Sequence, residues 1–109
     1  MISRTDKMER ELKRVIGMFI NEASNRKSLI TIIHCDISSD MKYTTIFVSV
    51  LPIEQEKTAV VFLNRIKNEA RKYLSERLRT RTIPYITFDI DLGERHRQRI
   101  EELSSNIKV

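Results

Sequence analysis

Apolar residues near the start of the chain recur at the spacing of a helix. They occupy every third or fourth position over residues 8–23, at Met8, Leu12, Val15, Ile16, Phe19, Ile20 and Ala23. This spacing places them on one helical face, so we predict an amphipathic helix over about residues 6–24. Thr5 and Asp6 are candidate caps for its first turn, and the polar stretch SNRKS ends it at residues 24–28.

Two runs rich in β-branched residues follow, LITIIHCDI at residues 29–37 and YTTIFVSVL at residues 43–51. The short polar stretch between them is typical of a turn, so we predict an antiparallel hairpin. Because that stretch has no glycine, a type I turn around Ser39 or Asp40 is favoured over a mirror-image turn.

A third run, IPYITFDID at residues 83–91, alternates apolar and polar positions. Such alternation predicts a strand with one face in the core. The core-facing residues are Ile86, Phe88 and Ile90, and the opposite face carries Thr87, Asp89 and Asp91.

A second helical stripe lies between these strands. Pro52 closes the second strand, and the helical spacing begins at about Glu54. The apolar positions of the stripe are Ala59, Leu63, Ile66, Ala70, Leu74 and Leu78.

Lys67 interrupts this stripe. On a helical projection it falls about 40° from Leu63, where a continuous helix would face the core. Two explanations stay open, because the lysine side chain can reach past the edge of the core to solvent, or the helix can break here. Asn68 favours the break, since asparagine tolerates a left-handed backbone. We therefore predict a kink near residues 67–68, with a further helix from about Glu69.

The predicted order of elements is α-β-β-α-α-β, followed by a short helix from Glu94 to about Leu103. This order favours an α+β fold in which helices cover one face of a three-stranded sheet. The length of 109 residues indicates one domain, residues 1–109, and the 40% hydrophobic and 32% charged content is ordinary for a soluble globular protein.

Several functional classes are disfavoured by composition. The N-terminal stretch MISRTDKMER has no apolar run after its charges, and no stretch has the roughly 20 apolar residues of a membrane span. A single cysteine, Cys35, cannot form an intrachain disulfide, which fits a reducing compartment. With 6% aromatic residues and no tryptophan, a broad aromatic stacking platform is not expected.

The positive charge of the chain is concentrated in residues 65–81, here called the basic segment. The segment holds seven basic and two acidic residues, so its net charge of +5 equals that of the whole chain. A concentrated positive field attracts polyanions, above all nucleic acid, although a solvated helix face gives the same pattern. A break at Lys67 would also open a helix N-terminus to phosphate, with Glu69 as a competing carboxylate.

No catalytic constellation is found. His34 and Cys35 are adjacent, but neighbours on a strand point to opposite faces, and Cys35 shares its predicted face with Ile33 and Ile37 in the core. Asp89, Asp91, Glu94 and His96 lack a compact ligand spacing, so solvated charges at a strand end are favoured over a cation site. With only two glycines, the chain has no glycine-rich phosphate loop.

The chain resembles the ribosome-binding factor A family over nearly its whole length. The resemblance is carried, in order, by RELKRVIGMFI, DISSDMKYTTIFVSVL, FLNRI, RLRTRTIPYITFDID and the pair Arg99 and Ile100. The Ala-x-Gly pattern that the family has at its kink falls on Ile66, Lys67 and Asn68, where both motif residues differ. The SNRKS stretch also departs from the Asp-Pro-Arg pattern common in the family.

The resemblance implies a KH-like domain of type II and a non-enzymatic assembly factor. Such a factor binds the immature small ribosomal subunit and its rRNA and assists rRNA processing and subunit maturation. We expect a monomer in the bacterial cytoplasm, with no cofactor, metal, small-molecule substrate or membrane partner. The expected RNA-binding residues are Arg65, Lys67, Asn68, Arg71, Lys72, Arg77, Arg79 and Arg81.

A protein-interaction module stays open as the alternative. In that case the basic segment would recognise an acidic protein partner or form a homo-oligomer. RNA of matched length would not compete with a protein-only interface, which separates the two hypotheses.

Overall fold

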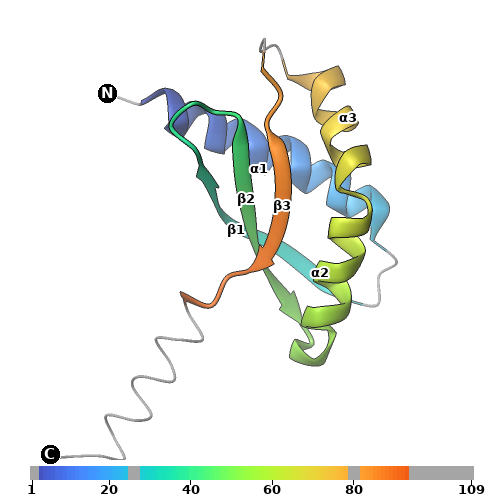
Figure 1. The fold of residues 1–109 in the computed structure, drawn as a ribbon. Coiled ribbons are helices and arrows are strands. Elements are labelled where there is room, and N and C mark those ends of the chain that lie inside the picture. Colours follow the sequence, from blue (N-terminus) through green and yellow to red (C-terminus); the bar gives the residue numbers. More distant parts are fainter. Residues whose placement is uncertain (1–2, 25–27, 79–81, 94–109) are drawn as a thin grey trace, which may run out of the picture.

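In the part of the chain that the structure describes, three α-helices and a three-stranded sheet follow one another in the predicted order (Figure 1). The computed structural model describes residues 3–24, 28–78 and 82–93. Its elements are α1 (Arg4–Ala23), β1 (Leu29–Ile37), β2 (Tyr43–Leu51), a 3₁₀ turn η1 (Ile53–Gln55), α2 (Glu56–Arg65), α3 (Lys67–Arg77) and β3 (Tyr85–Ile90). The helix predicted from Glu94 lies outside the described residues.

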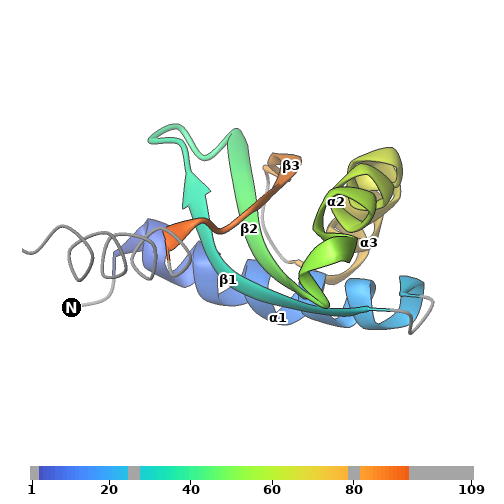
Figure 2. The same cartoon turned by 90° about the horizontal axis from the view of Figure 1, so that it is seen from below.

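The sheet has the order β1-β2-β3, with β1 antiparallel and β3 parallel to β2. Figure 1 looks onto its open face with α1 behind the strands, and Figure 2 shows α1 along β1 and the other two helices beside β3. On β3, Ile86 and Phe88 are buried while Tyr85, Thr87 and Asp89 are exposed, which confirms the predicted alternation. One face of the sheet therefore packs on the helices and the other faces solvent.

The first helix begins earlier than predicted, because its cap is Ser3. The Ser3 hydroxyl accepts a hydrogen bond from the Asp6 backbone N–H at 3.1 Å, and the Asp6 carboxylate accepts one from the Ser3 N–H at 3.3 Å. This reciprocal arrangement is a capping box. The predicted apolar face is confirmed, since six of its residues are buried in the core: Met8, Leu12, Val15, Ile16, Phe19 and Ile20.

The hairpin turn agrees with its prediction. The Met41 N–H donates to the Ser38 carbonyl at 2.8 Å, which places Ser39 and Asp40 at the centre of the turn. The Asp40 carboxylate accepts hydrogen bonds from the Ser38 hydroxyl at 2.6 Å and the Lys42 N–H at 3.0 Å. These contacts lower the pKa of Asp40, with the Ser38 hydroxyl as the largest cause.

The predicted inner face of β1 is corrected by a bulge. The register with β2 shifts between Ile32 and His34, so the side chains change face at this point. Ile32 packs against the core and Ile33 is 38% exposed, whereas Cys35 is buried as predicted. His34 stacks on Phe47 at 4.6 Å between ring centroids. His34 and Cys35 therefore occupy different faces, as expected.

The predicted kink is present but centred one residue earlier. Ile66, with φ −103° and ψ 16°, separates α2 from α3, and the second of these helices begins at Lys67 rather than Glu69. Lys67 is exposed, so the break explains its place in the sequence. The left-handed backbone considered for Asn68 is wrong, because Asn68 lies in the first turn of α3 and the only positive φ among the described non-glycine residues is at Met41.

Candidate nucleic-acid interface

The break at Ile66 gathers five residues of the basic segment around the start of α3. We call this surface the junction patch; it consists of Arg65, Lys67, Asn68, Arg71 and Lys72. Arg71 is half-buried and the other four side chains are exposed. Residues four apart on a helix share a face, so Lys67 lies next to Arg71, and Asn68 lies next to Lys72.

The N-terminus of α3 lies within the junction patch. Within the described residues no side chain caps it, and Ile66 serves as the cap position through its backbone alone. Free N–H groups and the helix dipole favour an anion at such an end. Glu69, considered above as a competitor, stands in this first turn without forming a cap.

A pocket of about 350 Å³ opens on the same surface. Its lining residues are Asn68, Arg71, Lys72, Ser75 and Ile83. The polar side chains among them can all donate hydrogen bonds, and none is a carboxylate. This lining suits a phosphate group better than a cation.

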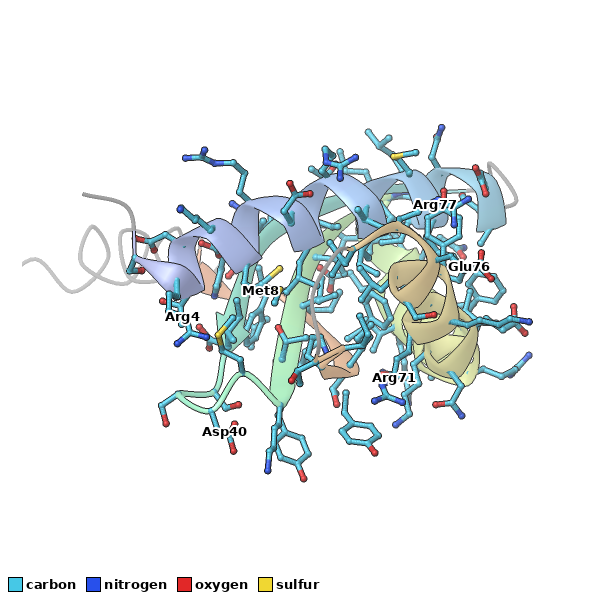
Figure 3. All side chains as sticks on the ribbon, turned by 90° about the horizontal axis from the view of Figure 1, so that it is seen from above. Arg4, Met8, Asp40, Arg71, Glu76 and Arg77 are labelled. Atoms are coloured by element: carbon cyan, nitrogen blue, oxygen red, sulfur yellow. The ribbon has the colours of Figure 1, made fainter. Side chains whose placement is uncertain are left out.

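Arg71 is held in place by the start of β3. Its Nη2 donates to the Ile83 carbonyl at 3.0 Å, and its guanidinium lies 4.1 Å from the centroid of the Tyr85 ring. The Nε atom is buried and has no hydrogen-bond partner among the described residues. Figure 3 shows Arg71 on the side of α3 that faces away from α1.

Arg77 faces another side of the molecule. Figure 3 places Arg77 and Glu76 toward α1, apart from Arg71. The Arg77 guanidinium lies 3.4 Å from the Tyr73 ring centroid and 3.4 Å from the Glu76 carboxylate. Tyr73 in turn packs edge-on against Phe19. Arg71 and Arg77, both expected to bind RNA, thus face different sides of the molecule. Arg79 and Arg81 lie outside the described residues.

Two tyrosines form a feature that the sequence reasoning missed. Tyr43 and Tyr85 begin neighbouring parallel strands and pair in register. Their rings stack with centroids 5.7 Å apart, and the residues are 61% and 56% exposed. The sequence does show both tyrosines at the start of a strand, but their adjacency depends on the pairing of β3 with β2.

Cys35 is a buried residue of the core. Its backbone N–H donates to the Glu9 carboxylate at 2.8 Å. Burial, followed by the charge of Glu9, raises the pKa of the Cys35 thiol to about 12. Because the thiolate is the reactive form, the protonated thiol is a core group rather than a catalyst.

Comparison with known proteins decides the family. The family model for ribosome-binding factor A matches residues 4–104. The chain belongs to the ribosome-binding factor A family. The ribosome-binding factor A of Pseudothermotoga lettingae is 32% identical over 105 residues, which cover 93% of this chain and 88% of that relative. Membership of this family confirms the expectation of a non-catalytic factor.

Solved structures of the family share the fold. The crystal structure of ribosome-binding factor A from Thermus thermophilus matches with a TM-score of 0.70 at 24% identity, over 77% of this chain and 92% of that one. A Thermus thermophilus homology model, fitted into a cryo-electron microscopy map of a complex with the 30S subunit, matches with a TM-score of 0.69 at 23% identity, over 79% of this chain and 93% of that one. The predicted KH-like α+β architecture is thereby confirmed.

No helix in the described part of the chain is both long enough and apolar enough to cross a membrane.

Asp89 and Asp91, considered above as cation ligands, accept hydrogen bonds from the backbone N–H groups of Ile90 and Gly93, respectively. Glu94 and His96 lie outside the described residues. These hydrogen bonds explain the two aspartates as part of the local structure at the end of β3.

Proposed function

We propose that this chain is an assembly factor that binds the immature small ribosomal subunit and its rRNA in the bacterial cytoplasm. Its whole length would act as one KH-like RNA-binding domain, and binding would assist rRNA processing and subunit maturation. Family membership supports this function, and so does the Thermus relative that was fitted into a 30S complex.

The junction patch is the observation that carries the proposal for the contact surface. Arg65, Lys67 and Lys72 are exposed cations beside the uncapped N-terminus of α3. Lysine and arginine side chains release counterions when they neutralise phosphates, which makes binding strong and salt-dependent. Arg79 and Arg81 stay predicted RNA contacts, whereas Arg77 is engaged with Tyr73.

The proposed mechanism requires no chemical step. A factor that binds one rRNA conformation more tightly than another shifts the population toward the bound form. The shift is limited by the difference between the two affinities, so contacts made in only one conformation matter most. A fixed patch at a helix junction provides such contacts, because its groups are held by α2 and α3 rather than by a loop.

The test is co-sedimentation with purified small subunits across a salt series, with large subunits as the control. A triple variant, Arg65→Ala, Lys67→Ala and Lys72→Ala, removes three exposed cations of the junction patch and leaves the core intact. We expect weaker binding and a slope of log affinity against log salt that is shallower by about 2.

A matched variant controls for net charge. Arg10→Ala, Lys13→Ala and Lys57→Ala removes three exposed cations elsewhere, and its binding should stay close to that of the wild type. The contact surface is wrong if both variants lose the same affinity and slope. Binding that resists competition by free RNA would instead support a protein interface.

A further inference from the structure

The open face of the sheet carries a row of flat groups at the end nearest the junction patch. In Figure 1, β3 runs between β2 and α3. Tyr85 is the first residue of β3, with the Arg71 guanidinium 4.1 Å from its ring and the Tyr43 ring 5.7 Å away. The order across the surface is therefore Arg71, Tyr85, Tyr43. Tyr43 ends the row, and this residue is 61% exposed.

Arg71 connects this row to the donor-lined pocket. It is one of the pocket residues, together with Asn68 and Lys72, and it also lies over Tyr85. Its buried Nε lacks a partner among the described residues, which is an uncommon state for a buried donor. The pocket and the aromatic surface thus share the Arg71 guanidinium.

The two ends of β3 differ in charge. At the far end from Tyr85, Asp89 is exposed and Asp91 follows the strand. Next to Tyr43, the Lys42 carbonyl accepts the Tyr85 N–H at 2.8 Å, and the charge of the Lys42 side chain is offset by that of Asp40 in the same turn. A polyanion is therefore attracted to the Tyr85 end by the cations of the junction patch and repelled from the Asp89 end.

We infer that this end of the sheet binds an unpaired stretch of RNA, with a phosphate in the pocket beside Arg71 and a nucleobase stacked on the row that ends at Tyr43. The inference rests on the proposed function and adds to its phosphate contacts a stacking surface for an unpaired base. Stacking suits any base, because every base has a π face, so the site distinguishes unpaired from paired RNA more than one sequence from another.

A peptide partner fits these observations less well. Exposed tyrosines occur at protein interfaces too, but the adjoining pocket contains two cationic side chains and no carboxylate, and the neighbouring helix end favours phosphate. In duplex RNA the base faces are covered by stacking and cannot reach an aromatic ring. Unpaired RNA is the ligand that uses both the ring and the donors.

The experiment compares three probes of equal length by fluorescence anisotropy: a single-stranded oligouridylate, the same backbone with abasic residues, and duplex RNA. The variant Tyr43→Leu removes the aromatic face and keeps an apolar side chain, and Tyr43→Phe is its matched control. We expect Tyr43→Leu to weaken oligouridylate binding about tenfold and Tyr43→Phe to retain it. Neither variant changes charge, so the salt slope should stay that of the wild type.

The abasic probe isolates stacking from phosphate binding. It should bind the wild type and Tyr43→Leu equally, and more weakly than oligouridylate binds the wild type. The chain has no tryptophan and three tyrosines, so quenching of tyrosine emission on binding oligouridylate gives a direct second readout, which should shrink in Tyr43→Leu.

Four results would overturn the inference: unchanged oligouridylate binding by Tyr43→Leu, equal wild-type affinity for the abasic probe and oligouridylate, tighter binding of the duplex, or no binding of oligouridylate at all. The proposed function is tested separately. If Tyr43→Leu has no effect but the wild type still binds small subunits in a salt-sensitive way, only the stacking site is wrong. If the junction-patch triple variant binds subunits normally, the proposed contact surface is wrong instead.

Discussion

At the scale of single residues, Asn64 joins the two elements that frame the junction patch. Its side-chain amide donates to the Phe88 carbonyl and accepts from the Phe88 N–H, each at 2.9 Å. β3 is an edge strand, so these two backbone groups have no strand partner on that side. Asn64 thereby satisfies the edge of β3 and fixes α2 against it.

We expect Asn64→Ala to lower the free energy of unfolding by about 2 kcal/mol, because it leaves two part-buried backbone groups unpaired. Urea denaturation measures the change. Asn21→Ala, at an exposed position of α1, is the control and should change stability by less than about 0.5 kcal/mol. If both variants changed the free energy of unfolding equally, the hydrogen bonds of Asn64 to Phe88 would add nothing beyond the loss of an exposed asparagine.

At the scale of elements, the conformation of Asn68 decides the nature of the kink. Asn68 is exposed and helical in α3, so alanine, with its higher helix propensity, should raise the free energy of unfolding by about 0.5 kcal/mol. A left-handed Asn68 would give the opposite sign, because alanine is strained there. Thermal and urea unfolding of Asn68→Ala and Asn68→Gly distinguish the two, with Gly expected to be the less stable variant.

The sequence determines most of the elements because burial is periodic. Helical spacing located the inner face of α1, and alternation located that of β3, since each pattern reports which positions leave water. The bulge at Ile33 escaped prediction because an extra residue in a strand changes the face of its neighbours without changing composition. The cap at Ser3 was not predicted, because Ser3, Thr5 and Asp6 are all residue types that cap helices and the apolar spacing does not choose among them.

At the scale of the whole molecule, the site depends on contacts between distant segments. The concentration of charge in the basic segment was visible in the sequence, and it led to the prediction of an RNA-binding surface near the helix junction. The row of Arg71, Tyr85 and Tyr43 was not visible, because it requires β3 to lie parallel to β2 and α3 to pack beside β3. Pairing of strands separated by two helices leaves no local mark on either strand.

The same arrangement gives the molecule a charge asymmetry that is open to test. Asp89 lies about 13 Å along β3 from Tyr85, beyond the screening length of about 8 Å at physiological salt. Replacing Asp89 and Asp91 by asparagine keeps their oxygen acceptors, so we expect association with oligouridylate to be about twofold faster at low salt and unchanged at about 0.5 M salt. Glu11→Gln with Glu54→Gln changes net charge equally at exposed sites elsewhere. Stopped-flow rates that rise alike in both double variants would show that total charge, rather than its position on β3, guides the RNA.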